Sequence, residues 1–143
     1  MMTRTIPSVL LALAFSQTLP AIAGEMVVIV SARNPVVALR PEQVADIFLA
    51  QTGRFPHGAD AVAIDQVLGS RQRDEFYSKV TSKSPALVKA YWTKMIFTGR
   101  GEPPKEAPNS AAVRKLVADN PALIGYIDKA SLDASVKAVM LIP

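Results

Sequence analysis

The arrangement of apolar and polar positions predicts alternating strands and helices along most of the chain. Residues 26–32 (MVVIVSA) form a continuous apolar, β-branched run, which predicts a strand covered on both faces. In the segment 40–51 (RPEQVADIFLAQ), Val44, Ile47 and Phe48 recur at helical spacing. This segment therefore predicts a helix that packs one face against the strand.

A second strand and helix follow a loop that contains glycine and proline. Residues 61–65 (AVAID) predict a short strand, and residues from about 70 to 80 predict a helix. We expect Phe76, Tyr77 and Val80 to form the buried face of that helix, because they recur at i, i+1 and i+4.

The strongest helical pattern in the chain begins at Ser84, a favourable N-cap residue, with Pro85 in the first helical position. Its apolar stripe is wide and comprises Leu87, Val88, Tyr91, Trp92, Met95 and Ile96. A stripe of this kind is more typical of core packing than of a ligand cage. We therefore predict that Trp92 is largely buried.

The last third of the chain predicts one further helix and two strands. Residues 98–109 contain glycine and proline without periodicity and predict a loop. Ser110 is expected to cap a short helix that ends at residues 120–121, and strands are expected at 122–128 and 136–141. The order β-α-β-α-α-α-β-β predicts an α/β fold, a three-layer sandwich with a mixed, mostly buried sheet.

The first 23 residues have the pattern of a secretory signal peptide. Arg4 precedes an apolar stretch from residue 6 to 15, and Ala21-Ile22-Ala23 forms a small-x-small cleavage signature. The alternative interpretation is a buried N-terminal helix. The signal peptide predicts a mature chain of residues 24–143, forming one domain in the periplasm. No cysteine follows the cleavage site, so we expect no lipid attachment.

Composition argues against several functional classes. The formal net charge is +4 and the charges are dispersed, a pattern that predicts no nucleic-acid-binding surface. The absence of cysteine excludes disulfides, thiol catalysis and zinc–thiolate sites. The one histidine, His57, lies in a turn-like FPHG segment, and no carboxylate cluster has metal-ligand spacing. We therefore expect neither an enzyme nor a bound metal or cofactor.

Two strand-to-helix junctions are candidates for anion binding, because helix N-termini offer free N–H groups beyond the ends of strands. The first is the segment 31–34 (SARN), and the second lies within IDQVLGSRQRDEF (64–76). The candidate ligand-binding residues are Gly69, Ser70, Arg71, Gln72, Arg73 and, from the first junction, Arg33. The alternative is an ordinary capped helix in which Asp74 and Glu75 neutralise the arginines.

Several segments in order resemble the phosphate-binding proteins of Pst-type ABC transporters. They are NPVVALRPEQVADIFLAQTGRFPHG, FYSKV with SPALVKAYWTKMIFTGRGEPP, and VADNPALIGYID, and the resemblance extends over nearly all of residues 26–141. It implies one lobe of a class II periplasmic binding protein. That family has two lobes that close around the anion, and this chain resembles the middle lobe of the full-length protein.

The chain departs from the family at the phosphate-binding pattern R.DGSGT. Placed on QVLGSRQ (66–72), the pattern retains two residues and loses the others: Gly69 and Ser70 match, whereas Gln66 replaces Arg, Leu68 replaces Asp, Arg71 replaces Gly and Gln72 replaces Thr. The resemblance therefore implies a phosphate or oxyanion binder of low affinity.

Two functions remain open from the sequence. The first is a periplasmic oxyanion-binding protein related to the substrate-binding components of ABC transporters, with Arg33 or Arg100 adding charge near Ser70 and Arg71. The second is a non-catalytic interaction module, because a lone lobe exposes the surface that its partner lobe would cover. Such a module would bind a membrane sensor, a transporter or a second copy of the chain.

Overall fold

The computed structural model describes residues 24–143, so the predicted signal peptide lies outside the described residues. The strands are β1 (Met26–Ser31), β2 (Val62–Gln66), β3 (Lys105–Ala107), β4 (Leu123–Asp128) and β5 (Val136–Ile142). The helices are α1 (Pro41–Phe48), α2 (Arg71–Thr81), α3 (Pro85–Phe97) and α4 (Ser110–Asp119), and a 3₁₀ turn, η1, spans Lys129–Ser131.

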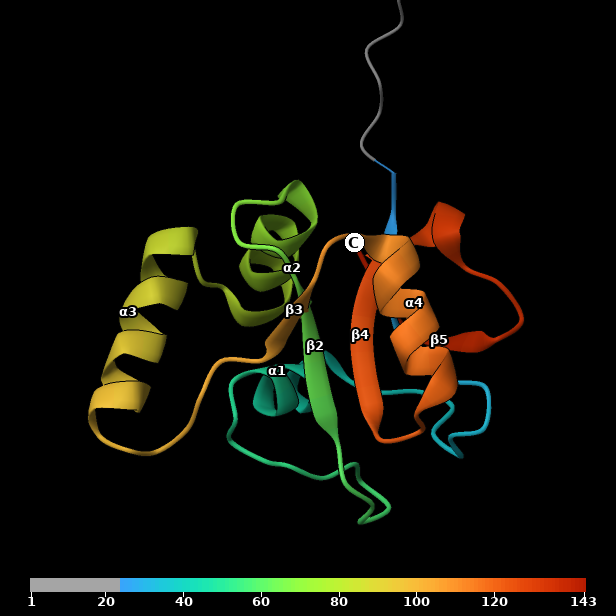
Figure 1. The fold of residues 1–143 in the computed structure, drawn as a ribbon, viewed down its shortest axis with the longest axis horizontal. Helices are drawn as coiled ribbons and strands as arrows, with labels where there is room; N and C mark the ends of the chain where they lie inside the picture. Colours follow the sequence, from blue (N-terminus) through green and yellow to red (C-terminus); the bar gives the residue numbers. More distant parts are fainter. Residues whose placement is uncertain (1–23) are drawn as a thin grey trace, which may run out of the picture.

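The five strands form one mixed sheet in the order β3-β2-β4-β1-β5 (Figure 1). β2 runs parallel to both β3 and β4, whereas β1 is antiparallel to β4 and to β5. The carboxyl ends of β2, β3 and β4 therefore meet at one edge of the sheet. The carboxyl end of β1 lies at the opposite edge.

Helices cover both faces of the sheet, as the apolar runs predicted. Alternate residues of β1 belong to two separate buried clusters. Val28 and Val30 pack on the side of α1 and α2, and Val27 and Ile29 pack on the side of α4. Figure 1 shows α4 in front of the sheet and α1 and α2 behind it. The predicted α/β sandwich with a mixed, mostly buried sheet is confirmed.

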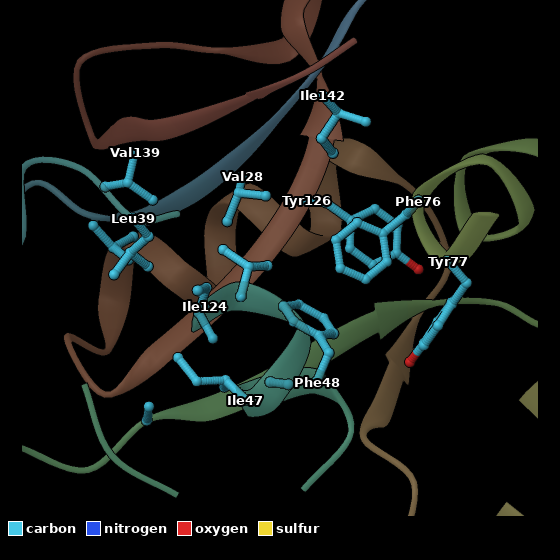
Figure 2. Packing of buried hydrophobic residues seen from close by; sticks show 14 of the residues in the cluster. Val28, Leu39, Ile47, Phe48, Phe76, Tyr77, Ile124, Tyr126, Val139 and Ile142 are labelled. Atoms are coloured by element: carbon cyan, nitrogen blue, oxygen red, sulfur yellow. The ribbon is translucent and has the colours of Figure 1, made fainter. Parts of the chain in front are cut away.

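Closely packed aromatic rings join α1 and α2 to the centre of the sheet (Figure 2). The ring of Phe76 in α2 stacks on that of Tyr126 in β4, with centroids 4.1 Å apart. Phe48 of α1 contacts Phe76 with a centroid separation of 4.5 Å. All three rings are fully buried, so they fix α2 against β4.

The long apolar stripe of α3 is only partly core. Val88, Trp92 and Met95 are buried, and the prediction for Trp92 is confirmed, since only 5% of its surface is exposed. The expectation that Leu87 and Ile96 are also core is wrong, because both are more than half exposed. The reason is position: α3 lies at the margin of the molecule and packs along one side (Figure 1).

The sequence misjudged the segment that leads into α4. Residues 98–109 were expected to form a loop, but Lys105–Ala107 pairs with β2 as the edge strand β3. The side chain that caps α4 belongs to Asn109, whose Oδ1 accepts a hydrogen bond from the N–H of Ala112 at 2.9 Å. Ser110, the expected cap, is the first residue of the helix, which leaves its hydroxyl available for other contacts.

The close approach of α4 to β4 at Gly125 can be tested by a single methyl group. A Cβ at this position would lie 2.5 Å from Cγ1 of Val113 and 3.4 Å from Cγ2 of Val117. We expect Gly125→Ala to lower the free energy of unfolding by about 1–3 kcal/mol, because a packed helix and strand must separate. Urea denaturation measures this change.

The matched control is Gly53→Ala, since no atom lies within 4 Å of a Cβ built at Gly53. Its free energy of unfolding should stay within about 0.5 kcal/mol of the wild type. Equal stability of Gly125→Ala and the wild type would contradict the packing described here.

Candidate functional site

The second predicted junction lies at the sheet edge where β2, β3 and β4 end and where α2 and α4 begin. Gly69 has a φ of +86°, a left-handed conformation that suits glycine and turns the chain into α2. Ser70 is the N-cap, and its Oγ accepts a hydrogen bond from the N–H of Arg73 at 3.2 Å. The N–H groups of Arg71 and Gln72 therefore lie in the first turn, at the positive end of the helix.

Arg71 and Gln72 both bind carboxylates. One arm of the Arg71 guanidinium donates to Glu75 Oε2 at 2.7 Å, and the other donates to Asp128 Oδ1 at 3.1 Å. Gln72 Nε2 donates to the second oxygen of Asp128 at 3.0 Å. The Arg71 side chain is still 45% exposed, so solvent ions can reach it.

Arg73, a candidate ligand-binding residue, is buried and already paired with carboxylates. Only 8% of its surface is exposed, and its guanidinium donates to Glu106 and lies 3.9 Å from Asp65. Glu106 also accepts a hydrogen bond from the N–H of Leu68, so it holds the turn before α2. Arg73 thus belongs to the interior, because it shares the inward face of α2 with Phe76.

The structure does not bring Arg33 together with the other five candidates. Arg33 follows β1, which runs antiparallel to β4, and therefore lies at the opposite edge of the sheet. Its guanidinium donates to the carbonyl oxygens of Ala118 and Asp119, at the C-terminal end of α4. A cation at this position stabilises the helix terminus.

Sequence reasoning missed two residues at the junction, Ser110 and Asp128. Ser110 Oγ accepts from the backbone N–H of Asp128 and from Gln66 Nε2, at 3.0 and 3.1 Å. The same hydroxyl donates to Asp128 Oδ2 at 3.3 Å. The sequence held one part of the signal, because Asp128 ends a predicted strand, but only the structure shows that this strand runs parallel to β2 and ends beside it.

Gln66 and Leu68, which replace an arginine and an aspartate of the family's phosphate-binding pattern, have other roles. Gln66 is buried, and its amide also donates to the carbonyl oxygen of Tyr126 at 3.0 Å. Leu68, at the position of an aspartate in the family pattern, is 76% exposed. The polar side chains that meet at this edge are those of Arg71, Gln72 and Ser110, and all three donate to Asp128.

A buried carboxylate lies beneath the junction. Asp65 Oδ2 accepts from the hydroxyl of Tyr77, and Oδ1 accepts from the hydroxyl of Tyr126, each at 2.8 Å. Burial raises the pKa of Asp65 to about 6, although nearby Arg73 and the two hydroxyl donors oppose the shift. Burial and the Asp65 charge raise the pKa values of both tyrosines. Asp65 therefore holds α2 and β4 together and binds a proton more tightly than an ordinary aspartate.

An apolar cavity of about 570 Å³ separates α2 from α3 next to this junction. Its lining includes Leu68, Gly69, Tyr77, Val88, Trp92 and Ile96. The charged side chains of Arg73 and Lys89 border it. The cavity thus adjoins the polar edge but offers mainly apolar contacts.

Residues 24–143 hold no group of three or more histidine and carboxylate side chains placed to bind a metal ion. None of the helices in this range is long and apolar enough to cross a membrane.

No protein-family model matches the chain, and no curated protein matches its sequence. Solved structures do match. One is described as a phosphate ABC transporter substrate-binding protein from Clostridium perfringens with bound phosphate; its TM-score is 0.65 at 27% identity over 81% of this chain. Another, an ABC-type phosphate transport receptor from Vibrio cholerae, has a TM-score of 0.65 at 21% identity over 82% of this chain.

A third similar structure is PstS from Borrelia burgdorferi, with a TM-score of 0.59 at 13% identity over 81% of this chain. The chain spans only 44–46% of the length of these three proteins. Its fold is therefore that of one part of a phosphate ABC transporter substrate-binding protein, as the sequence resemblance predicted.

The pKa of Asp65 predicts a stability change between pH 5 and pH 7. Since the folded-state pKa lies above its ordinary value of 3.8, the group stabilises the fold at low pH, and this contribution is lost as the pH rises through about 6. We expect the wild type to lose about 1 kcal/mol of unfolding free energy between pH 5 and 7, relative to Asp65→Asn.

Urea denaturation of both proteins at the two pH values measures this difference. The comparison with Asp65→Asn cancels the pH dependence that both proteins share. An identical change in both proteins would show that Asp65 does not titrate in this range.

Proposed function

We propose that this chain, whose fold is that of one part of a phosphate ABC transporter substrate-binding protein, binds phosphate or a related oxyanion. The site would lie where α2 and α4 begin, with Ser70, Arg71 and Gln72 on one helix and Ser110 on the other. The proposal is one of binding, and it assigns no catalytic step to these residues.

One observation carries the proposal: donors from two helix N-termini converge on the same pair of oxygen atoms. Arg71, Gln72 and Ser110 all donate to the Asp128 carboxylate. A guanidinium combined with N-terminal helix dipoles favours an anion, and phosphate presents oxygen acceptors similar to those of a carboxylate. The bound phosphate in the Clostridium perfringens structure supports the same ligand class.

The affinity should be weak. Arg71 is nearly half exposed, so its contacts with a ligand would be screened by water and salt. Gln66 and Leu68 also lack the charges of the family pattern at their positions. We expect a Kd for phosphate in the range of about 0.1–10 mM.

The proposed location is the periplasm, and the proposed protein partner is an ABC transporter. Both come from the signal-peptide pattern of residues 1–23 and from the similarity to transporter substrate-binding proteins. A periplasmic protein of this kind would meet free oxyanions directly.

A second candidate function, protein docking, is favoured by the exposed apolar side chains of α3. Phe97 is 91% exposed, and Leu87 and Ile96 on the same helix are more than half exposed. Large apolar side chains that stay exposed on one helix favour contact with a partner protein. This function needs no small ligand, so a titration with phosphate separates it from oxyanion binding.

A phosphate titration followed by two-dimensional ¹H–¹⁵N NMR tests the proposed function at constant ionic strength. We expect the amide signals of Ser70, Arg71 and Gln72 to shift with a single millimolar Kd. Arg71→Ala should weaken binding several-fold, because it removes the one exposed guanidinium of the site. Its unfolding free energy should change little, since exposed ion pairs contribute little to stability.

The matched control is Arg54→Ala. Arg54 is also an exposed arginine paired with a carboxylate, 3.7 Å from Asp60, but it lies near the amino end of β2. Its affinity should stay within about twofold of the wild type. Unchanged spectra at roughly 10 mM phosphate, or equal losses in the two variants, would reject oxyanion binding at α2.

A further inference from the structure

The Asp128 carboxylate already accepts hydrogen bonds from the donors at the start of α2 and α4. Its Oδ1 accepts from Arg71 Nη2 at 3.1 Å, and its Oδ2 accepts from Gln72 Nε2 and Ser110 Oγ at 3.0 and 3.3 Å. These three donors come from the first turns of α2 and α4. Asp128 is therefore bound in the way that an external anion would be.

The hydroxyl proton of Ser110 is already donated to Asp128. It accepts from the backbone N–H of Asp128 and from Gln66 Nε2, so both of its lone pairs are engaged. Its single O–H can then donate only to Asp128 Oδ2. Donation to a phosphate oxygen would require this bond to break.

Arg71 is divided between two carboxylates. Glu75 Oε2 accepts from Nη1 at 2.7 Å, and Glu75 is itself held by Lys79 at 2.7 Å. The Nη2 arm, which Asp128 occupies, is the arm on the side of Gln72 and Ser110. Departure of Asp128 would free Nη2 while Glu75 keeps the guanidinium in place.

We propose that Asp128 is a built-in competitor for the oxyanion: its carboxylate holds Arg71, Gln72 and Ser110 without ligand and leaves them when phosphate binds. This inference rests on the proposed function, since it concerns control of the same site. The side chain of Asp128 is 25% exposed, so it can rotate toward solvent. A carboxylate that stayed beside a bound phosphate would also repel it.

Competition between Asp128 and phosphate raises the apparent Kd for phosphate by an amount that can be measured. The apparent Kd equals the intrinsic Kd divided by the fraction of molecules whose donors are free. If Asp128 occupies the donors in roughly nine molecules of ten, its removal lowers the apparent Kd about tenfold. We therefore expect Asp128→Ala to bind phosphate about tenfold more tightly than the wild type.

The test is the phosphate titration by ¹H–¹⁵N NMR on wild type, Asp128→Ala, Asp128→Asn and Asp60→Ala. Asp60→Ala is the control, because it removes one exposed carboxylate that also pairs with an arginine, near the amino end of β2. Its Kd should stay within about twofold of the wild type. Asp128→Asn removes the charge but keeps one acceptor oxygen in a side chain of the same shape. We therefore expect a smaller gain in phosphate affinity and a smaller effect on folding than for Asp128→Ala.

The outcomes separate this inference from the proposed function. Tighter binding in the Asp128 variants alone supports the competitor. Equal binding by the wild type and a folded Asp128 variant would overturn it, while the proposed function stands. If the wild type binds no phosphate at roughly 10 mM, the proposed function fails and this inference fails with it. The dispersion of the amide signals reports folding, and Asp128→Asn replaces Asp128→Ala if the latter unfolds.

Discussion

The position of the candidate site depends on the buried carboxylate of Asp65. This one group accepts hydrogen bonds from Tyr77 in α2 and from Tyr126 in β4, while Arg73 links it to Glu106 in β3. A buried charge is tolerated only when such partners surround it. The network therefore joins α2 to three neighbouring strands and sets where the first turn of the helix lies.

Because of this network, the two arginines of α2 have different environments, one buried and one exposed to solvent. Arg73 lies on the inward face and completes the buried network, so it is not free to bind a ligand. Arg71 lies on the outward side, where it pairs with Glu75 and Asp128 in contact with solvent. A sequence pattern that counts both as anion ligands overestimates the site. The groups that remain for the proposed oxyanion binding are the Arg71 guanidinium, the Gln72 amide, the Ser110 hydroxyl and the helix N-terminus.

Sequence patterns predicted most elements of the fold because apolar side chains form long, periodic runs in them. β3 was missed because its three residues, Lys105–Ala107, are mostly polar and pair with β2 alone. The sequence analysis wrongly grouped Arg33 with the other site residues. The direction of a strand depends on how it pairs with its neighbours, and a local sequence pattern does not contain that information. The burial of Arg73 could have been predicted, since Arg73 and Phe76 share a helical face. For Asp128 the sequence showed only that it ends a predicted strand, and its place beside the end of β2 became known from the strand order in the structure.

The account's central claim is that phosphate and Asp128 bind the same donors at the junction of α2 and α4. A crystal structure of the protein grown with phosphate tests this claim most directly. The account predicts a phosphate bound to Arg71, Gln72 and Ser110, with the Asp128 carboxylate rotated away from them. A phosphate bound elsewhere, or an Asp128 that keeps all three donors beside a bound phosphate, would contradict it.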